Sequence, residues 1–135
     1  MLCIIIRGIP GCGKSALVKV LTDFWGDRGT SAVCSSDDFL IDDDGEYKFD
    51  KIRSARAHAK CMQKFEKALA SKTGLVIIDN TNVKKEHFSS YLRKANEAEY
   101  KVFCIIVENR HGGKSVHDVP IDKINEMLSD FSIKL

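Results

Sequence analysis

The tripeptide Gly-Lys-Ser occurs twice in this chain, in GIPGCGKS at 8–15 and in GGKS at 112–115. The first copy fits Gly-x-x-x-x-Gly-Lys-Ser, the pattern of a phosphate-binding loop between a strand and a helix. Glycines allow backbone amides to surround a polyphosphate, and a helix N-terminus adds the positive end of its dipole. Lys14 suits the β- and γ-phosphates of a nucleoside triphosphate, and the Ser15 hydroxyl suits Mg²⁺. We therefore predict that ATP, or another nucleoside triphosphate, binds together with Mg²⁺ at Gly8, Ile9, Pro10, Gly11, Cys12, Gly13, Lys14, Ser15 and Ala16.

The second copy does not fit that pattern. Glu108 stands where the first glycine would be required, and no long helix follows Ser115. The segment NRHGGKSVHD follows an apolar run, and ligands of open α/β sheets bind beyond the carboxyl ends of the strands. We predict that this loop folds over the bound triphosphate and brings Arg110 and Lys114 to the transferring phosphoryl group. The alternative is a solvated basic loop.

Carboxylates follow two other apolar runs. Asp37 and Asp38 come just after SAVCS, and Asp79 ends GLVIID, so in a parallel sheet all three would lie at the edge that holds the phosphate-binding loop. Asp79 is a candidate magnesium ligand, and one of the pair is a candidate acceptor for the proton of an attacking hydroxyl. A turn or helix cap at Asp79 and a capping pair at 37–38 are the alternatives, and spacing does not say which carboxylate is the base. DDDG at 42–45 is interpreted as a solvated acidic turn.

Basic side chains recur at helical spacing between 51 and 72. They are Arg53, Arg56, Lys60, Lys64 and Lys67. This spacing places them on one helix face, which we call the basic stripe. The phosphates of a polyanion would follow such a face, with an affinity that falls as salt rises, while a solvated charged surface is the equal alternative. His58 and His87 are interpreted as surface residues rather than ligands.

Strands and helices must position these groups. Apolar runs at 2–8, 31–35, 74–79 and 100–107 are predicted strands, and helical periodicity covers 14–25, 50–71, 84–98 and a last helix that Pro120 opens. Continuous apolar strands that alternate with helices are typical of a parallel sheet covered on both faces. We predict one doubly wound α/β domain over residues 1–135.

Apolar positions also predict which face of each helix is buried. They are 17, 18, 21, 24 and 25 in the first helix, 52, 55, 59, 62, 65 and 69 in the second, Phe88, Tyr91, Leu92 and Ala95 in the third, and Ile121, Ile124 and Leu128 in the last.

Composition narrows the class of protein. Hydrophobic residues make up 44% and charged residues 30%, which is typical of a globular domain rather than a disordered chain. The net charge is +2, too small to indicate a partner by itself. The five cysteines form no CxxC pair, and they favour buried, reduced thiols in a cytoplasmic protein over a disulfide scaffold. The apolar runs are too short to cross a bilayer, and we expect no membrane association and no signal peptide.

Together these motifs resemble the P-loop kinase domain of polynucleotide 5′-hydroxyl kinases. The matching segments are GIPGCGKS (8–15), SSDDF (35–39), GEYKF (45–49), IIDNTN (77–82) and NRHGGKSVHDVP (109–120) with the helix after it. The resemblance implies an adenylate-kinase-like three-layer sandwich with a four-stranded parallel sheet of order 2-3-1-4. It also implies transfer of the γ-phosphoryl group of ATP to the 5′-hydroxyl end of a nucleic acid.

Site residues carried over from the family answer the question that spacing left open. Asp37 becomes the base, and the lid arginine falls on Arg110 or is replaced by Lys114, according to how the loop is aligned. The residues assigned to the nucleic-acid substrate are Asp38, Asn80, Thr81 and Asn82 in the matching segments, together with Arg53 and Arg56 from the basic stripe. One position departs from the phage member of the family, because Leu40 stands where an arginine lies near the substrate phosphate.

Two other functions remain open at the level of sequence. A kinase for a small hydroxylated molecule fits Leu40 and the modest net charge. A nucleotide-dependent binding module would hold ATP without transferring its phosphoryl group. The oligomeric state is not indicated.

Overall fold

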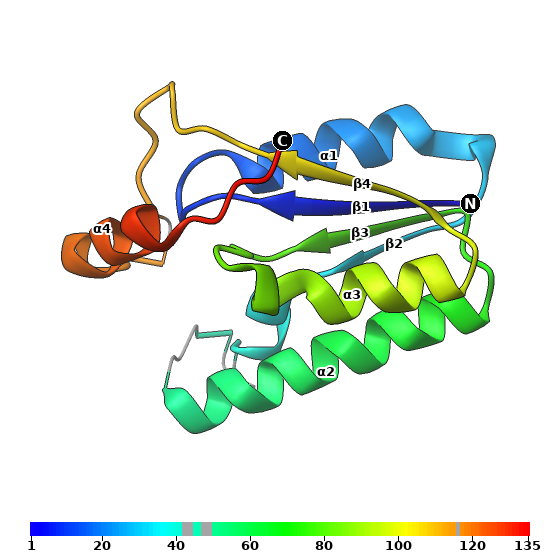
Figure 1. Ribbon diagram of the computed structural model, residues 1–135, viewed down its shortest axis with the longest axis horizontal. Helices are drawn as coiled ribbons and strands as arrows, with labels where there is room; N and C mark the ends of the chain where they lie inside the picture. Colours follow the sequence, from blue (N-terminus) through cyan, green and yellow to red (C-terminus); the bar gives the residue numbers. More distant parts are fainter. Residues whose placement is uncertain (42–44, 47–49, 116) are drawn as a thin grey trace.

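Four parallel strands form the central layer of the fold (Figure 1). They are β1 (Leu2–Arg7), β2 (Ser31–Cys34), β3 (Leu75–Asp79) and β4 (Lys101–Ile106). Their order across the sheet is β2-β3-β1-β4, and every pairing is parallel. The α/β class and the strand order 2-3-1-4 are therefore confirmed.

The computed structural model describes residues 1–135 apart from 42–44, 47–49 and 116. The acidic turn predicted at 42–45 and the match GEYKF at 45–49 lie, except for residues 45 and 46, outside the described residues.

Helices cover both faces of the sheet, as the three-layer prediction requires. α1 (Lys14–Trp25) lies on one face, and α2 (Lys51–Ala70) and α3 (Lys85–Glu97) lie on the other. The side chains of β1 alternate between two apolar clusters, with Ile4 and Ile6 toward α1 and Cys3 and Ile5 toward α2 and α3. Because both faces are buried, the strand needs an uninterrupted apolar sequence. No helix in the described part of the chain has the length and apolar character needed to cross a membrane.

The buried face of α2 differs from the one predicted. The residues it buries are Ala57, Cys61, Phe65 and Ala68, with Met62 and Leu69 half-buried. Ile52, at 69% exposure, points to solvent, so the predicted stripe that began there was wrong in its first half. The small side chains of Ala57 and Cys61 let the helix approach the sheet closely, and Phe65 packs edge-to-face on Tyr91 of α3. The third helix, with Tyr91 and Ala95 buried, follows the prediction.

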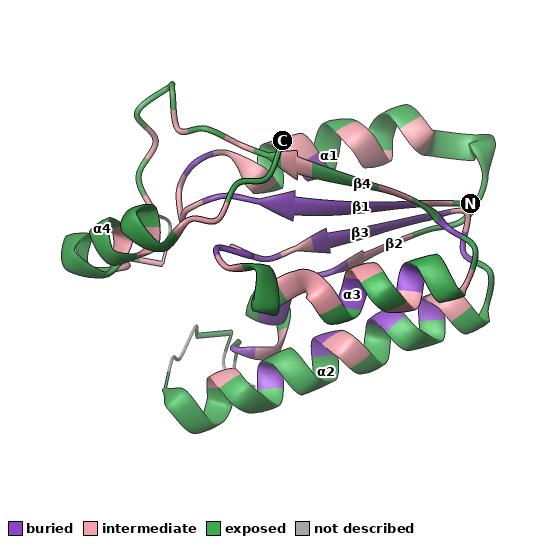
Figure 2. Cartoon of the chain, in the orientation of Figure 1, coloured by how far each residue is buried: buried purple, intermediate pink, exposed green. Residues whose placement is uncertain are grey.

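Two other expectations of burial were also wrong. β4 is an edge strand, and its residues Phe103 (47%) and Ile106 (37%) stay exposed, whereas β1 and β3 inside the sheet are largely buried (Figure 2). In α1 itself Phe24 is 70% exposed. An apolar run therefore indicated the strand correctly but not its burial on both faces.

The last helix, α4 (Ile121–Asp130), begins after Pro120 as predicted. It does not pack on the sheet, however, but lies beyond the carboxyl ends of the strands (Figure 1). Ile121 and Leu128, predicted to face inward, are 67% and 53% exposed, and no residue of the helix is buried. A helix in this place covers a site rather than a core.

The cysteines serve as apolar core residues. Cys3, Cys12, Cys34 and Cys61 are buried, Cys104 is exposed, and all five are free thiols. Burial raises the pKa of Cys3 and of Cys34 to about 12, so that both remain protonated. Four of the five thiols are thus buried, as the prediction of mostly buried cysteines requires, and none of the five is paired in a disulfide.

Candidate active site

The phosphate-binding loop (residues 8–16) connects β1 to α1. Gly11 and Gly13 have φ angles of 81° and 100°, a region in which other residues are strained, and Gly13 is the N-cap of α1. The helix therefore starts with its amides at the mouth of the loop. Lys14 Nζ donates to the carbonyl oxygen of Ile9 at 2.9 Å, within reach of the loop that a triphosphate would enter.

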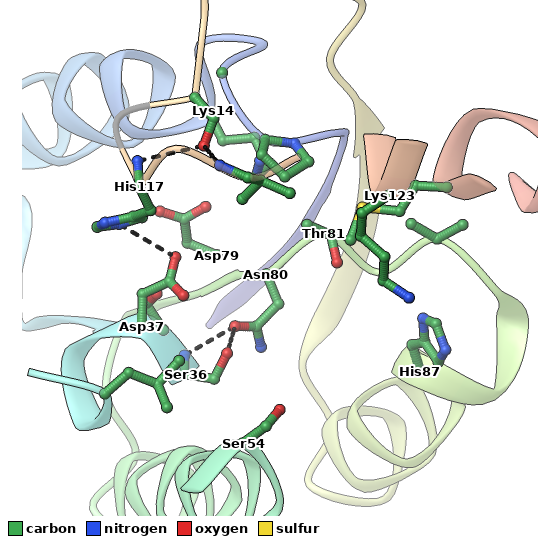
Figure 3. Close-up of a pocket in the computed structure, with 18 of the residues that line it drawn as sticks. Lys14, Ser36, Asp37, Ser54, Asp79, Asn80, Thr81, His87, His117 and Lys123 are labelled. Carbon is green, nitrogen blue, oxygen red and sulfur yellow. Dashed lines mark hydrogen bonds and ion pairs between the residues drawn. The ribbon is translucent and has the colours of Figure 1, made fainter. Parts of the chain in front are cut away.

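A cleft of about 1020 Å³ opens at the carboxyl edge of the sheet, beside this loop (Figure 3). Its polar lining comes from several elements and includes Lys14, Ser15, Asp37, Asp38, Ser54, His58, Asp79, Asn80, Thr81, His117 and Lys123. The cleft thus brings the loop lysine and the three predicted carboxylates to one cavity. The α4 residues Glu126 and Met127 form part of its outer wall.

Electrostatic coupling links these groups. Burial raises the pKa of Asp79, the Lys14 ammonium opposes this rise, and the Asp37 and Asp38 carboxylates add to it. Asp79 and Ser15 are oxygen donors of the kind that Mg²⁺ prefers, and both line the cleft. Among the described residues no group of three or more His, Cys, Asp or Glu side chains is arranged to hold a metal ion.

Asp37 stands on a one-turn 3₁₀ helix, Ser36–Phe39, directly after β2. The side chain of Asn80, directly after β3, fixes this turn, since its Oδ1 accepts hydrogen bonds from both the amide and the hydroxyl of Ser36 at 2.8 Å. The Asn80 amide nitrogen reaches Cys61 Sγ of α2 at 3.7 Å. Asn80, predicted to bind substrate, thus lines the cleft and also connects the 3₁₀ helix that carries Asp37 to α2 and to the end of β3.

The second Gly-Lys-Ser copy lies in a loop, residues 109–115 and 117–119, which we call the lid loop and which packs on the phosphate-binding loop at Gly11. A Cβ on Gly11 would lie 2.5 Å from the Lys114 carbonyl carbon, so only glycine admits the lid backbone there. Lys114 and His111 line a smaller hollow of about 210 Å³ with Gly13 and Ala16. Arg110 is bonded to Glu108, and its side chain is 84% exposed. Of the two predicted lid cations, the structure places Lys114 beside the phosphate-binding loop.

The basic stripe lies on the exposed surface of α2, as its spacing predicted. Arg53 and Arg56 are not among the cleft residues, and the Arg53 side chain lies 3.5 Å from Asp50, the N-cap of α2. The same helix instead turns Ser54 and His58 toward the cleft. His58 and His87 are exposed as expected, yet both line the cavity, a position that helical periodicity gave no reason to expect.

Of the residues in the DNTN segment that were predicted to bind substrate, Asn80 and Thr81 line the cleft and Asn82 does not. Thr81 lines the cleft, and its carbonyl oxygen accepts the Gly8 amide at 3.0 Å. Asn82 is 2% exposed, takes a φ of 46° and donates to the Ile6 carbonyl oxygen at 2.8 Å. Asn82 therefore connects β1 to the chain after β3 and is not among the residues that line the cleft.

Arg7, which sequence patterning did not single out, closes the fold behind the cleft. It is 4% exposed. It donates to the carbonyl oxygens of Asn82 (2.7 Å), Val83 (2.9 Å) and Ser132 (2.5 Å), and its guanidinium lies 4.4 Å and 4.8 Å from the ring centroids of Phe88 and Phe131. The segment after α4 is thereby attached to the end of β1. In the sequence, the only sign of this role is that Arg7 is a charged residue at the end of an apolar run.

A comparison with protein families matches residues 3–112 to the family described as AAA domain. Human NEDD4-binding protein 2 is 27% identical over 138 residues, which include 97% of this chain. The chain spans only 8% of the length of that relative.

Solved structures share the fold at low sequence identity. A chain of the Pnkp1/Rnl/Hen1 complex has a TM-score of 0.62 at 19% identity, over 92% of this chain and 38% of that chain. The APS kinase CysC of Mycobacterium tuberculosis (Cys556Ala mutant) has a TM-score of 0.58 at 12% identity, over 96% and 95%. At these identities the similarity shows the fold alone, which is that of a kinase-like P-loop domain.

Proposed function

The chain belongs to the AAA domain family, and from that premise we propose that it transfers the γ-phosphoryl group of ATP to the 5′-hydroxyl end of a polynucleotide. One observation carries this proposal. A single cleft holds the phosphate-binding lysine, Lys14, on one side and the exposed carboxylate of Asp37 on the other, with Asp79 between the elements that bear them. A donor site and a proton acceptor in one cavity are what direct phosphoryl transfer requires.

In this mechanism the protein positions reactants and stabilises charge. The amides of the phosphate-binding loop and Lys14 hold the triphosphate, and Lys114 adds a positive charge from the lid loop. Ser15 and Asp79 would hold Mg²⁺, which when bound neutralises charge on the phosphates. Asp37 accepts the proton of the attacking hydroxyl while the new O–P bond forms and the bond from the γ-phosphorus to the leaving ADP oxygen breaks.

The polynucleotide acceptor is supported by sequence motifs and by surface charge. SSDDF, IIDNTN and the lid segment all contribute to the cleft, and these are the segments that resemble polynucleotide kinases. The structural relative in the Pnkp1/Rnl/Hen1 complex belongs to an assembly described as an RNA repair complex. The basic stripe starts at the cleft end of α2 and offers a path for the phosphates beyond the reacting end.

A small hydroxylated acceptor is the second candidate. Leu40, which lines the cleft at 5% exposure, puts an apolar side chain where the phage enzyme has an arginine, and Arg53 and Arg56 lie outside the cavity. An acceptor without a phosphate next to its hydroxyl would need no charge there.

The deciding assay supplies labelled ATP with 5′-hydroxyl DNA, 5′-hydroxyl RNA and a panel of small alcohols. We expect transfer to an oligonucleotide by the wild type, and a loss of at least about 100-fold in Lys14→Ala and in Asp37→Ala. Lys14→Ala should also weaken ATP binding measured by calorimetry, whereas Asp37→Ala should bind ATP normally. Transfer to small alcohols alone would favour the second candidate. ATP binding without transfer to any acceptor would indicate a binding module, and full activity of Asp37→Ala would remove its role as base.

A further inference from the structure

The lid loop connects the two halves of the proposed active site. At its start Asn109 brackets Gly113, with Asn109 Nδ2 donating to the Gly113 carbonyl oxygen at 2.8 Å and the Gly113 amide donating to Asn109 Oδ1 at 3.0 Å. This closed turn sets the backbone of 113–115 against Gly11 of the phosphate-binding loop. The position of the lid loop is therefore tied to the loop that would hold the nucleotide.

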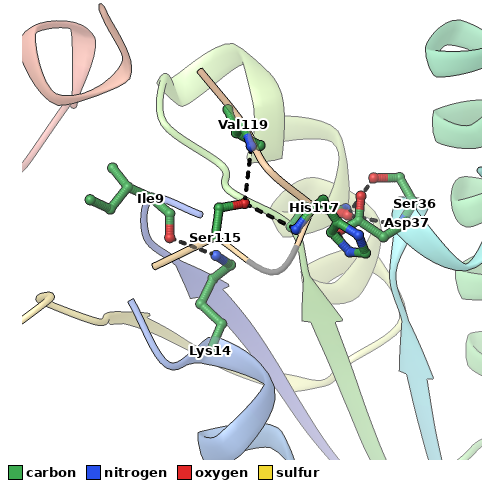
Figure 4. A network of polar contacts seen from close by, with 8 residues as sticks. Ile9, Lys14, Ser36, Asp37, Ser115, His117 and Val119 are labelled. Carbon is green, nitrogen blue, oxygen red and sulfur yellow. Dashed lines mark hydrogen bonds and ion pairs between the residues drawn. The ribbon is translucent and has the colours of Figure 1, made fainter. Parts of the chain in front are cut away.

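At its other end the lid loop reaches the proposed base (Figure 4). Ser115 Oγ accepts the amides of His117 at 3.3 Å and of Val119 at 3.4 Å, which turns the chain back toward the cleft. His117 Nε2 then lies 3.9 Å from Asp37 Oδ2. The imidazole is the more enclosed partner, since its side chain is 31% exposed and that of Asp37 is 53% exposed.

We propose that His117 is a positioning residue for Asp37, holding the carboxylate in the orientation that accepts the proton of the attacking hydroxyl. This rests on the proposed function. The Asp37 and Asp38 carboxylates both raise the pKa of Asp79, so these three acidic side chains act on the same part of the cleft. An imidazole N–H of His117 next to Oδ2 would offset the repulsion among these carboxylates and favour one orientation of the Asp37 carboxylate.

At 3.9 Å the contact is longer than a hydrogen bond. Catalytic hydrogen bonds often tighten only in the substrate complex. Because the lid loop packs on the phosphate-binding loop at Gly11, a nucleotide held there would lie next to the loop that carries His117. During transfer the hydroxyl proton passes to Asp37 as the O–P bond forms and the bond to the ADP oxygen breaks, while His117 keeps its own protons.

Two substitutions of His117 distinguish a role in orienting Asp37 from a role in filling space. His117→Gln keeps an N–H donor near the position of Nε2, and His117→Phe keeps the ring without a donor. We expect kcat to fall about 10- to 100-fold in His117→Phe, with the KM values for ATP and for the oligonucleotide changed less than about 3-fold. His117→Gln should stay within about 5-fold of the wild type in kcat.

Three results would overturn the proposal: wild-type kcat in His117→Phe, equal losses in both variants, or a loss confined to the KM for ATP. An independent readout is the ¹⁵N chemical shift of the His117 imidazole in the full chain, which Asp37→Asn should change and which must stay unchanged if the two side chains do not interact. If the wild type phosphorylates no oligonucleotide, the proposed acceptor is wrong, and the imidazole shift alone then decides whether His117 contacts Asp37.

Discussion

Replacement of Arg7 by Met tests how the segment after α4 is held. Arg7 is 4% exposed, its guanidinium donates to three main-chain carbonyl oxygens, and it contacts two phenylalanine rings. Each hydrogen bond of a charged donor contributes about 1.5–3 kcal/mol, and each ring contact adds about 0.5–1 kcal/mol. Part of that sum is returned because the charge no longer has to be desolvated, so we expect a net loss of about 3–5 kcal/mol in the free energy of unfolding. At about 3 °C per kcal/mol for a chain of this size, the melting temperature should fall by roughly 10–15 °C.

Thermal unfolding followed by circular dichroism measures this loss, and Arg28→Met is the matched control. Arg28 also stacks on a phenylalanine, Phe24, with its guanidinium 4.6 Å from the ring centroid, but it is exposed. The control should change stability by less than about 0.5 kcal/mol. Hydrogen exchange adds a local readout, since the Ser132 amide donates to the Val83 carbonyl oxygen at 3.0 Å and should lose protection in Arg7→Met. A melting temperature within about 2 °C of the wild type would refute the role assigned to Arg7.

Two further predictions concern charge in and around the cleft. Burial raises the pKa of Asp79 above its value in the unfolded chain, so its ionised form costs stability at neutral pH and this cost is removed as pH falls through the folded-state pKa. Asp79→Asn should therefore raise the melting temperature of the ligand-free protein at pH 7 and have a smaller effect at pH 4, while lowering transfer; equal effects at both pH values would contradict the cause given. Arg53→Glu with Arg56→Glu should raise the KM for an oligonucleotide about 10-fold at low salt without changing the KM for ATP. Arg28→Glu with Lys72→Glu, at the opposite end of the strands, is the control, and a similar rise there would show only a general effect of net charge.

The elements that line the proposed phosphate site were predictable because their signals are local. Gly13 and Lys14 stand at the junction of an apolar strand and an amphipathic helix, and the backbone geometry of such a junction suits a phosphate group. Asp37 and Asp79 follow strands, and parallel strands put their carboxyl ends at one edge. The contact of Asp37 with His117 depends instead on how residues far apart in the chain pack, which no spacing expresses.

The wrong predictions about which side chains are buried share one physical cause. Periodicity reports which side chains lie on one helix face, but whether that face meets the sheet depends on the position of the element in the fold. α4 has an apolar stripe that includes Ile121 and Leu128, yet it lies over the cleft, and its stripe stays exposed. In α2 the small residues Ala57 and Cys61 face the sheet and Ile52 does not. The reason is that the first turn of the helix, which carries Ile52, extends past the end of the sheet toward the cleft.

The two Gly-Lys-Ser segments differ in the structure around their serines, and this difference predicts different roles for Ser15 and Ser115. Ser15 stands in the first turn of α1, on a loop whose left-handed glycines leave the backbone amides to a ligand. Ser115 has no helix after it, and its hydroxyl accepts two amides of its own turn, at His117 and Val119. That oxygen is used to fold the lid loop, so it is a poor ligand for magnesium. Ser115→Ala should accordingly impair transfer by displacing His117, with a loss in kcat like that of His117→Phe, whereas Ser15→Ala should weaken the magnesium dependence of ATP binding. If Ser115→Ala changed the magnesium dependence instead, the second copy would belong to the nucleotide site after all.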